Sequence, residues 1–158
     1  MMTGRDRLMT ALQGGRPDRV PIFLRDITLG LDLCDYDTTE VEVNDLVKVS
    51  VGLEFAPPIE MKAGMVVLDV SVPTGFAPVA ESVAAVVEGN EQIKRYEIAG
   101  RKVIFYIEDM EAGDKINFSF DVKALYPVKA KGVASQAYSY YNPDIKAETL
   151  GEGIVVTE

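Results

Sequence analysis

The feature that most constrains the fold is a strict alternation of apolar and polar side chains over residues 115–124. Successive side chains of a β-strand point to opposite faces, so this pattern predicts a strand with one buried face. Residues 47–55 repeat the pattern, with valine, leucine or phenylalanine at every second position. Each strand has an apolar face that must be covered, which indicates a sheet packed against a second layer.

Further strand patterns follow at short spacing along the chain. Residues 66–72 form another apolar row, and Ala99-Gly100 is a hairpin signal between two short strands. The last strands are predicted within residues 133–141 and 154–156. The sequence therefore predicts an all-β fold, an antiparallel β-sandwich of about seven to nine strands.

One helix interrupts the strands. Residues 78–88 have a proline in the first turn and valines at helical spacing, and Gly89 marks the end. We interpret the valine stripe as part of the core, with the short helix lying across an end or edge of the sandwich.

The 158 residues are enough for one domain and a short extension. The composition changes near residue 40, because the cations before it are all arginine and those after it are mostly lysine. We assign residues 1–40 to an N-terminal extension with a helix over residues 5–13, and residues 41–158 to the sandwich. Removing the extension is expected to leave the thermal stability nearly unchanged.

Charge and residue usage exclude several functions. A formal net charge of −9 argues against binding nucleic acid or an anionic membrane through a broad basic face. The chain has no histidine, and its one cysteine, Cys34, has no second cysteine for a disulfide or a zinc cluster. Phosphate loops, nucleophile elbows and metal-ligand spacings are also absent. We therefore expect no enzymatic activity, no cofactor and no metal.

Two local clusters invite a chemical interpretation. Residues 108–114 hold four carboxylates, but without the spacing of an EF-hand they favour a solvated hairpin turn over a calcium loop. Tyr138, Tyr140 and Tyr141 could form a platform for sugars or bases. Alternation instead favours packing, with Tyr138 and Tyr140 on one face and Tyr141 on the other.

Two stretches carry a resemblance to a known family. Residues 63–76 read AGMVVLDVSVPTGF, a strand ending in a Thr-Gly-Phe corner, and residues 125–144 read LYPVKAKGVASQAYSYYNPD. Over roughly residues 41–158, these motifs resemble the C-terminal receptor-binding domain of α2-macroglobulins, which are thioester-containing protease traps. The resemblance implies a non-catalytic protein-interaction domain of an endopeptidase inhibitor. Its partners would be other macroglobulin-like domains, above all the thioester-bearing one, or a cell-surface protein.

The same resemblance points to positions on the helix. In vertebrate members, an endocytic receptor recognises two lysines that lie one turn apart, and the alignment of motifs places Ala80 and Ala84 there. Glu81 and Glu88 on this helix would repel acidic receptor modules. We name Ala80, Glu81, Ala84 and Glu88 as interaction candidates that lack the receptor-binding lysines.

Residues 2–25 resemble a different family, the start of uroporphyrinogen decarboxylases and corrinoid methyltransferases, through the run PDRVPIFLRD. Those enzymes are TIM barrels, and eight strands cannot close from this length. The alternative function is therefore a remnant of such an enzyme fused to an unrelated sandwich.

Location follows from two opposing arguments. The first thirty residues hold no apolar run of signal-peptide length, and no segment approaches the roughly 18 consecutive apolar residues of a membrane span. The residues alone predict a cytoplasmic chain that does not insert into a membrane. The α2-macroglobulin resemblance implies an extracellular or periplasmic domain.

Overall fold

The computed structural model describes residues 29–36, 40–57 and 61–158, with the backbone alone for residues 29–36. Its strands are β1 (Leu29–Tyr36), β2 (Glu40–Glu42), β3 (Leu46–Phe55), β4 (Lys62–Ser71), β5 (Phe76–Pro78), β6 (Ile93–Ala99), β7 (Lys102–Glu111), β8 (Lys115–Ala124), β9 (Val128–Ala130), β10 (Ala134–Ser139), β11 (Lys146–Leu150) and β12 (Ile154–Thr157). The helix of the described part is α2 (Ala80–Glu88). The predicted helix over residues 5–13 lies outside the described residues.

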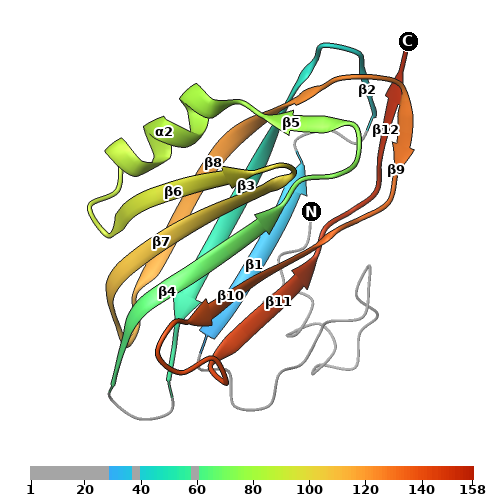
Figure 1. The fold of residues 1–158 in the computed structure, drawn as a ribbon. Coiled ribbons are helices and arrows are strands. Elements are labelled where there is room, and N and C mark those ends of the chain that lie inside the picture. The colour runs from blue at the N-terminus through green and yellow to red at the C-terminus, as the bar shows by residue number, and fades with distance from the viewer. Residues whose placement is uncertain (1–28, 37–39, 58–60) are drawn as a thin grey trace, which may run out of the picture.

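Two sheets face each other in a sandwich (Figure 1). The first has the strand order β1-β3-β8-β5 and the second has the order β11-β10-β4-β7-β6, with antiparallel neighbours throughout. β3 and β8, the two strands with the cleanest alternation, pair without interruption from Leu46↔Lys123 to Glu54↔Lys115. The predicted all-β sandwich is confirmed.

The core lies between the two sheets and is built from the alternating apolar positions. Val47, Leu53 and Phe55 of β3 are buried on the inner face of the first sheet. From the second sheet, Phe105 contacts the rings of Phe118 and Phe120 of β8, with centroid distances of 4.9 and 5.9 Å. Aromatic side chains bury large areas, so this cluster ties the sheets together at their centre.

Helix α2 covers one open edge of the sandwich, between β6 of one sheet and β8 of the other (Figure 1). Val83 and Val86 are its buried residues and face the core. The helix begins two residues later than predicted because Pro78 is still paired with Val122 as the last residue of β5. The predicted short helix at an edge is therefore confirmed.

The described part of the chain has twelve strands, more than the seven to nine predicted. β2, β5 and β9 contain three residues each, too few to show an alternating pattern. β2, β12 and β9 form a small third sheet at one end of the molecule, in which β2 and β12 are parallel. This pair is the one departure from an antiparallel arrangement in the described sheets.

Strand β1 requires a correction of the predicted division at residue 40. Leu29–Tyr36 pairs with β3 from Leu29↔Phe55 to Tyr36↔Val49, with one irregularity after Leu33. These residues therefore belong to the first sheet and not to an appended extension. The sequence analysis missed this strand although its sequence, LGLDLCDY, has leucine at every second position from Leu29 to Leu33.

Candidate functional site

Three of the four predicted interaction positions on α2 are exposed. These are Ala80, Glu81 and Glu88, whereas Ala84 is half-buried. The first turn carries the acidic Glu81, and the last turn carries no basic residue. The helix thus presents two carboxylates and small apolar side chains, a surface with no cation for an acidic partner.

Ser82 attaches this helix to the first sheet, a role that the sequence analysis missed. Its hydroxyl donates to the Val79 carbonyl at 2.8 Å and accepts from the Asp121 amide of β8 at 2.9 Å. The Val79 amide in turn donates to the Asp121 carbonyl at 2.9 Å. At the other end, the Asn90 side chain donates to the Val86 carbonyl at 2.7 Å. The first turn of the helix is therefore fixed to β8, and the Asn90 side chain caps the last turn.

A second surface is the aromatic corner, which we define as Tyr140 and Tyr141. The two side chains are 56% and 75% exposed, and their rings meet edge to face with a centroid distance of 5.3 Å. The predicted split of these tyrosines between two faces is wrong, because β10 ends at Ser139 and both lie in the turn after it. Tyr138 does lie in the strand, on its outward face opposite Val67, and is half-buried.

The aromatic corner is positioned by an irregular stretch of β4. The Tyr140 amide donates to the Met65 carbonyl at 2.8 Å, and the register of β4 shifts on both sides of Gly64. Gly64 has φ +65°, and a Cβ there would lie 3.3 Å from Cδ2 of Tyr141. The glycine therefore makes room for the Tyr141 ring to lie against the backbone.

The acidic segment over residues 108–114 is mostly strand, which corrects the predicted turn. β7 continues to Glu111 with Met110 fully buried, and only the last three residues form the connection. Oδ2 of Asp114 accepts from the Glu111 amide at 2.8 Å and from Nε2 of Gln92 at 3.1 Å. These hydrogen bonds, the backbone one first, lower the pKa of the Asp114 carboxyl. The Asp114 carboxylate thus holds the turn in place.

Lys62 of β4 pairs with this segment from the neighbouring strand. Its Nζ lies 2.6 Å from Oε1 of Glu111, and this hydrogen bond and charge raise the pKa of Lys62. Within the described residues, no group of three or more histidine, cysteine, aspartate or glutamate side chains has an arrangement that could hold a metal ion. The helix described here is also too short and too polar to cross a membrane.

A third surface is a polar hollow on the outward face of the second sheet. Its volume is about 220 Å³, and it is lined by Asp69, Ser71, Lys102, Ala134, Ser135, Gln136 and Glu148. Asp69 is only 9% exposed, although it points away from the core. Its signal in the sequence is an aspartate inside the apolar run MVVLDV, which the sequence analysis did not interpret.

Comparison with known proteins identifies the fold. A family model described as the A-macroglobulin receptor binding domain matches residues 61–151. Native alpha-2-macroglobulin from Escherichia coli, spanning domain MG7 to the C-terminus, is 13% identical with a TM-score of 0.70, covering 91% of this chain and 25% of that chain. The native conformation of the E. coli protein gives 0.71 at 13% identity, with 91% and 10% covered.

A Salmonella alpha-2-macroglobulin mutant, Y1175G, is also similar, with a TM-score of 0.67, 13% identity and coverage of 91% and 10%. The chain thus spans a quarter or less of these structures. None of these matches supports the resemblance of residues 2–25 to decarboxylases and methyltransferases, and those residues lie outside the described part.

Proposed function

The chain belongs to the A-macroglobulin receptor binding domain family, and from this premise we propose that it is the non-catalytic interaction domain of an alpha-2-macroglobulin-like protease trap. Domains of this family interact with proteins. The parent protein would hold a thioester and inhibit endopeptidases, and this domain would pack against the thioester-bearing domain until cleavage rearranges the two. We place it outside the cytoplasm, in an extracellular or periplasmic compartment.

The proposed function does not use the lysine-based receptor mode. Ala80 and Ala84 supply no charge, and Glu81 and Glu88 are exposed carboxylates on the same helix. Acidic receptor modules bind lysines through complementary charge, so this helix would repel them. The partner is instead a neighbouring domain or another cell-surface protein.

The observation that best supports the proposed interaction is the exposure of the aromatic corner. Tyrosine is enriched at the energetically dominant positions of protein interfaces, because it buries a large area at a low cost in conformational entropy. Tyr140 and Tyr141 are the two most exposed aromatic side chains in the described part of the chain, and both are held against β4. We propose that this corner contacts the neighbouring domain.

The test is association with the remaining domains of an alpha-2-macroglobulin-like protein that is produced without its own receptor-binding domain. Size-exclusion chromatography and calorimetry should detect a complex. Tyr141→Ser should weaken it about tenfold or more, as expected for an interface tyrosine.

The matched control is Tyr126→Ser, because Tyr126 is 49% exposed and lies outside the aromatic corner, between β8 and β9. This variant should bind like the unmodified chain. Absence of a complex would refute the proposed function, and an equal loss in both variants would refute the role of the aromatic corner.

A further inference from the structure

The polar hollow contains a buried carboxylate that is only half satisfied. Oδ2 of Asp69 accepts from Nζ of Lys102 at 2.7 Å. Oδ1 is buried and has no hydrogen-bond partner among the described residues. Burial of a charged oxygen without a donor is costly, and most such groups in proteins are satisfied. Asp69 therefore needs a further donor, and that donor is not supplied by the described residues.

The existing partner of Asp69 is weakly held. The Lys102 side chain is 52% exposed, whereas that of Asp69 is 12% exposed, so the cation of the pair remains largely in water. An exposed lysine gains little from such a pair, because solvent screens the charge and the long side chain loses rotamer freedom. Because Asp69 is buried, Lys102 can leave the hollow only when another cation takes its place beside the Asp69 carboxylate.

The remaining lining groups define what that cation must be. Glu148 adds a second, exposed carboxylate, and the Gln136 side chain adds an amide oxygen. The Ser135 hydroxyl already accepts from the Ser71 amide at 2.9 Å. The hollow thus offers more acceptors than donors, and Asp69, Glu148 and Lys102 together carry a net charge of −1.

A guanidinium group matches these acceptors. It is permanently charged and holds five N–H donors in a rigid plane, so it can donate to several acceptors at once. An ammonium group has the charge but concentrates its donors at one nitrogen. The net charge of −9 of the whole chain also attracts a cationic partner.

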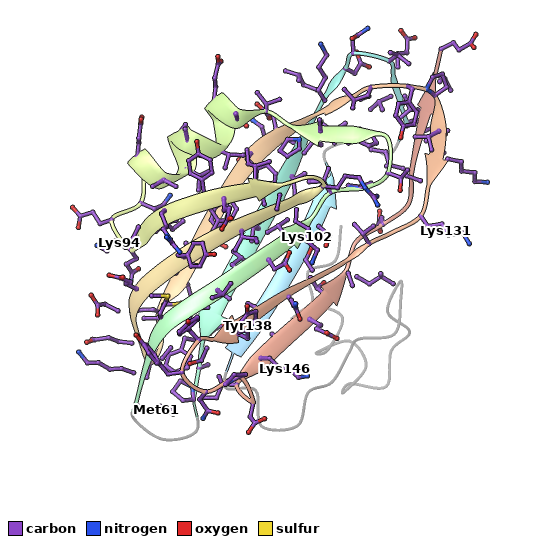
Figure 2. All side chains as sticks on the ribbon, viewed as in Figure 1. Met61, Lys94, Lys102, Lys131, Tyr138 and Lys146 are labelled. Carbon is purple, nitrogen blue, oxygen red and sulfur yellow. The ribbon has the colours of Figure 1, made fainter. Side chains whose placement is uncertain are left out.

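The outward face of the second sheet, on which the hollow opens, has features of a protein-binding surface. Tyr138 and Lys102 lie on the outward face of this sheet (Figure 2). On the same face, Arg95 stacks over the Tyr106 ring at 4.0 Å, and the Tyr106 hydroxyl donates to Glu97 at 3.1 Å. The Tyr106 side chain is thus held in place on the face that carries the hollow, and aromatic side chains are enriched in protein interfaces.

We propose that the hollow binds an arginine side chain of a partner protein, and that Lys102 occupies its place in the unbound domain. This inference rests on the proposed function, since it names the chemistry of the partner of an interaction domain. The arginine would displace the Lys102 ammonium, pair with Asp69 and Glu148, and supply the donor that Oδ1 of Asp69 lacks.

The test uses the full chain and a blocked arginine, Nα-acetyl-arginine methylamide, which imitates an arginine within a protein. Binding is followed by amide chemical shifts at Ser71, Ser135 and Gln136. The neutral isostere Nα-acetyl-citrulline methylamide should give no shift, and the matching lysine compound should bind more weakly. Equal binding of citrulline or lysine, or tighter binding of a free polyamine, would overturn the proposal.

Substitutions in the hollow should change the affinity for the arginine compound in opposite directions. Lys102→Met keeps the aliphatic stem and removes the competing charge, so it should bind the arginine compound about tenfold more tightly and gain more thermal stability from it. Lys115→Met, which removes a lysine paired with Glu54 at 3.5 Å on the first sheet, should behave like the unmodified chain. An unchanged or weaker affinity in Lys102→Met would refute the displacement.

The acceptors are tested by Asp69→Asn, which should abolish binding, and by Glu148→Gln, which should weaken it. Glu148 is exposed, so its variant reports on binding even if Asp69→Asn does not fold. Retained affinity in Glu148→Gln would contradict the assignment. If the arginine compound does not bind but the macroglobulin-like domains still associate, this inference fails and the proposed function stands.

Discussion

Gly75 shows how one residue shapes the Thr-Gly-Phe corner between β4 and β5. Its φ of +90° lies in the region that favours glycine. A Cβ at this position would overlap the Val128 side chain and lie 3.6 Å from Cε2 of Tyr126. The Gly75 carbonyl also accepts from the Leu125 amide at 2.8 Å. The corner therefore needs both the backbone conformation and the small size of glycine.

We predict that Gly75→Ala lowers the free energy of unfolding by about 2–4 kcal/mol, from backbone strain and from overpacking against Val128. Gly100→Ala is the matched control, because Gly100 has φ +61° but a Cβ there would meet nothing within 4 Å. It should lose only about 1–2 kcal/mol. Urea denaturation measures both, and equal losses would show that the Val128 contact is unimportant.

At the scale of elements, the attachment of α2 to β8 depends on Ser82. We predict that Ser82→Ala lowers stability by about 1–2 kcal/mol, because the Asp121 amide loses its acceptor. Ser119→Ala, at an exposed position of the same strand β8, should change stability by less than about 0.5 kcal/mol. Thermal unfolding compares them, and a loss no larger than that of the control would argue against this anchor.

Strand β1 gives the second prediction at this scale. A chain starting at residue 37 should be less stable than one starting at residue 29, by about 1 kcal/mol for each hydrogen bond lost between β1 and β3. It should also aggregate more readily, because the exposed edge of β3 is free to pair with another chain. Light scattering and calorimetry measure both effects. Equal stability of the two chains would show that β1 contributes little to the sheet.

At the scale of the whole molecule, the sandwich separates its candidate surfaces. Helix α2 lies along one edge (Figure 1), the aromatic corner follows the end of β10, and the polar hollow opens on the outward face of the second sheet. A protein-interaction domain with three separate surfaces can contact more than one neighbour. The association test and the arginine test address two of these surfaces independently.

Local pattern was enough for the long strands and not for the short ones. β3 and β8 were predicted almost to the residue, because each shows its buried face through alternation. β2, β5 and β9 have three residues each, and their hydrogen bonds come from partners far along the chain. The order of strands in a sheet likewise depends on contacts between residues far apart in the sequence, which a short stretch of sequence does not show.

The candidate sites divide in the same way. Through the resemblance of motifs alone, the positions on α2 were named as interaction candidates from the sequence. The exposure of Tyr141 was not, since it depends on where β10 ends and on the irregularity of β4 at Gly64. Asp69 was also missed as a site, because its burial arises from neighbouring strands, with Gln136 on one side and Ile104 on the other.

The sequence by itself determined the all-β class, the strands β3 and β8, the helix at the edge and the resemblance to α2-macroglobulins. Each of these follows from side-chain periodicity or from a contiguous motif. The tertiary structure alone decided that β1 joins the first sheet, that the aromatic corner is exposed and that Asp69 is buried beside Lys102. These features depend on which distant segments of the chain come into contact. The free energy of such a contact depends on both segments, so neither segment alone predicts it.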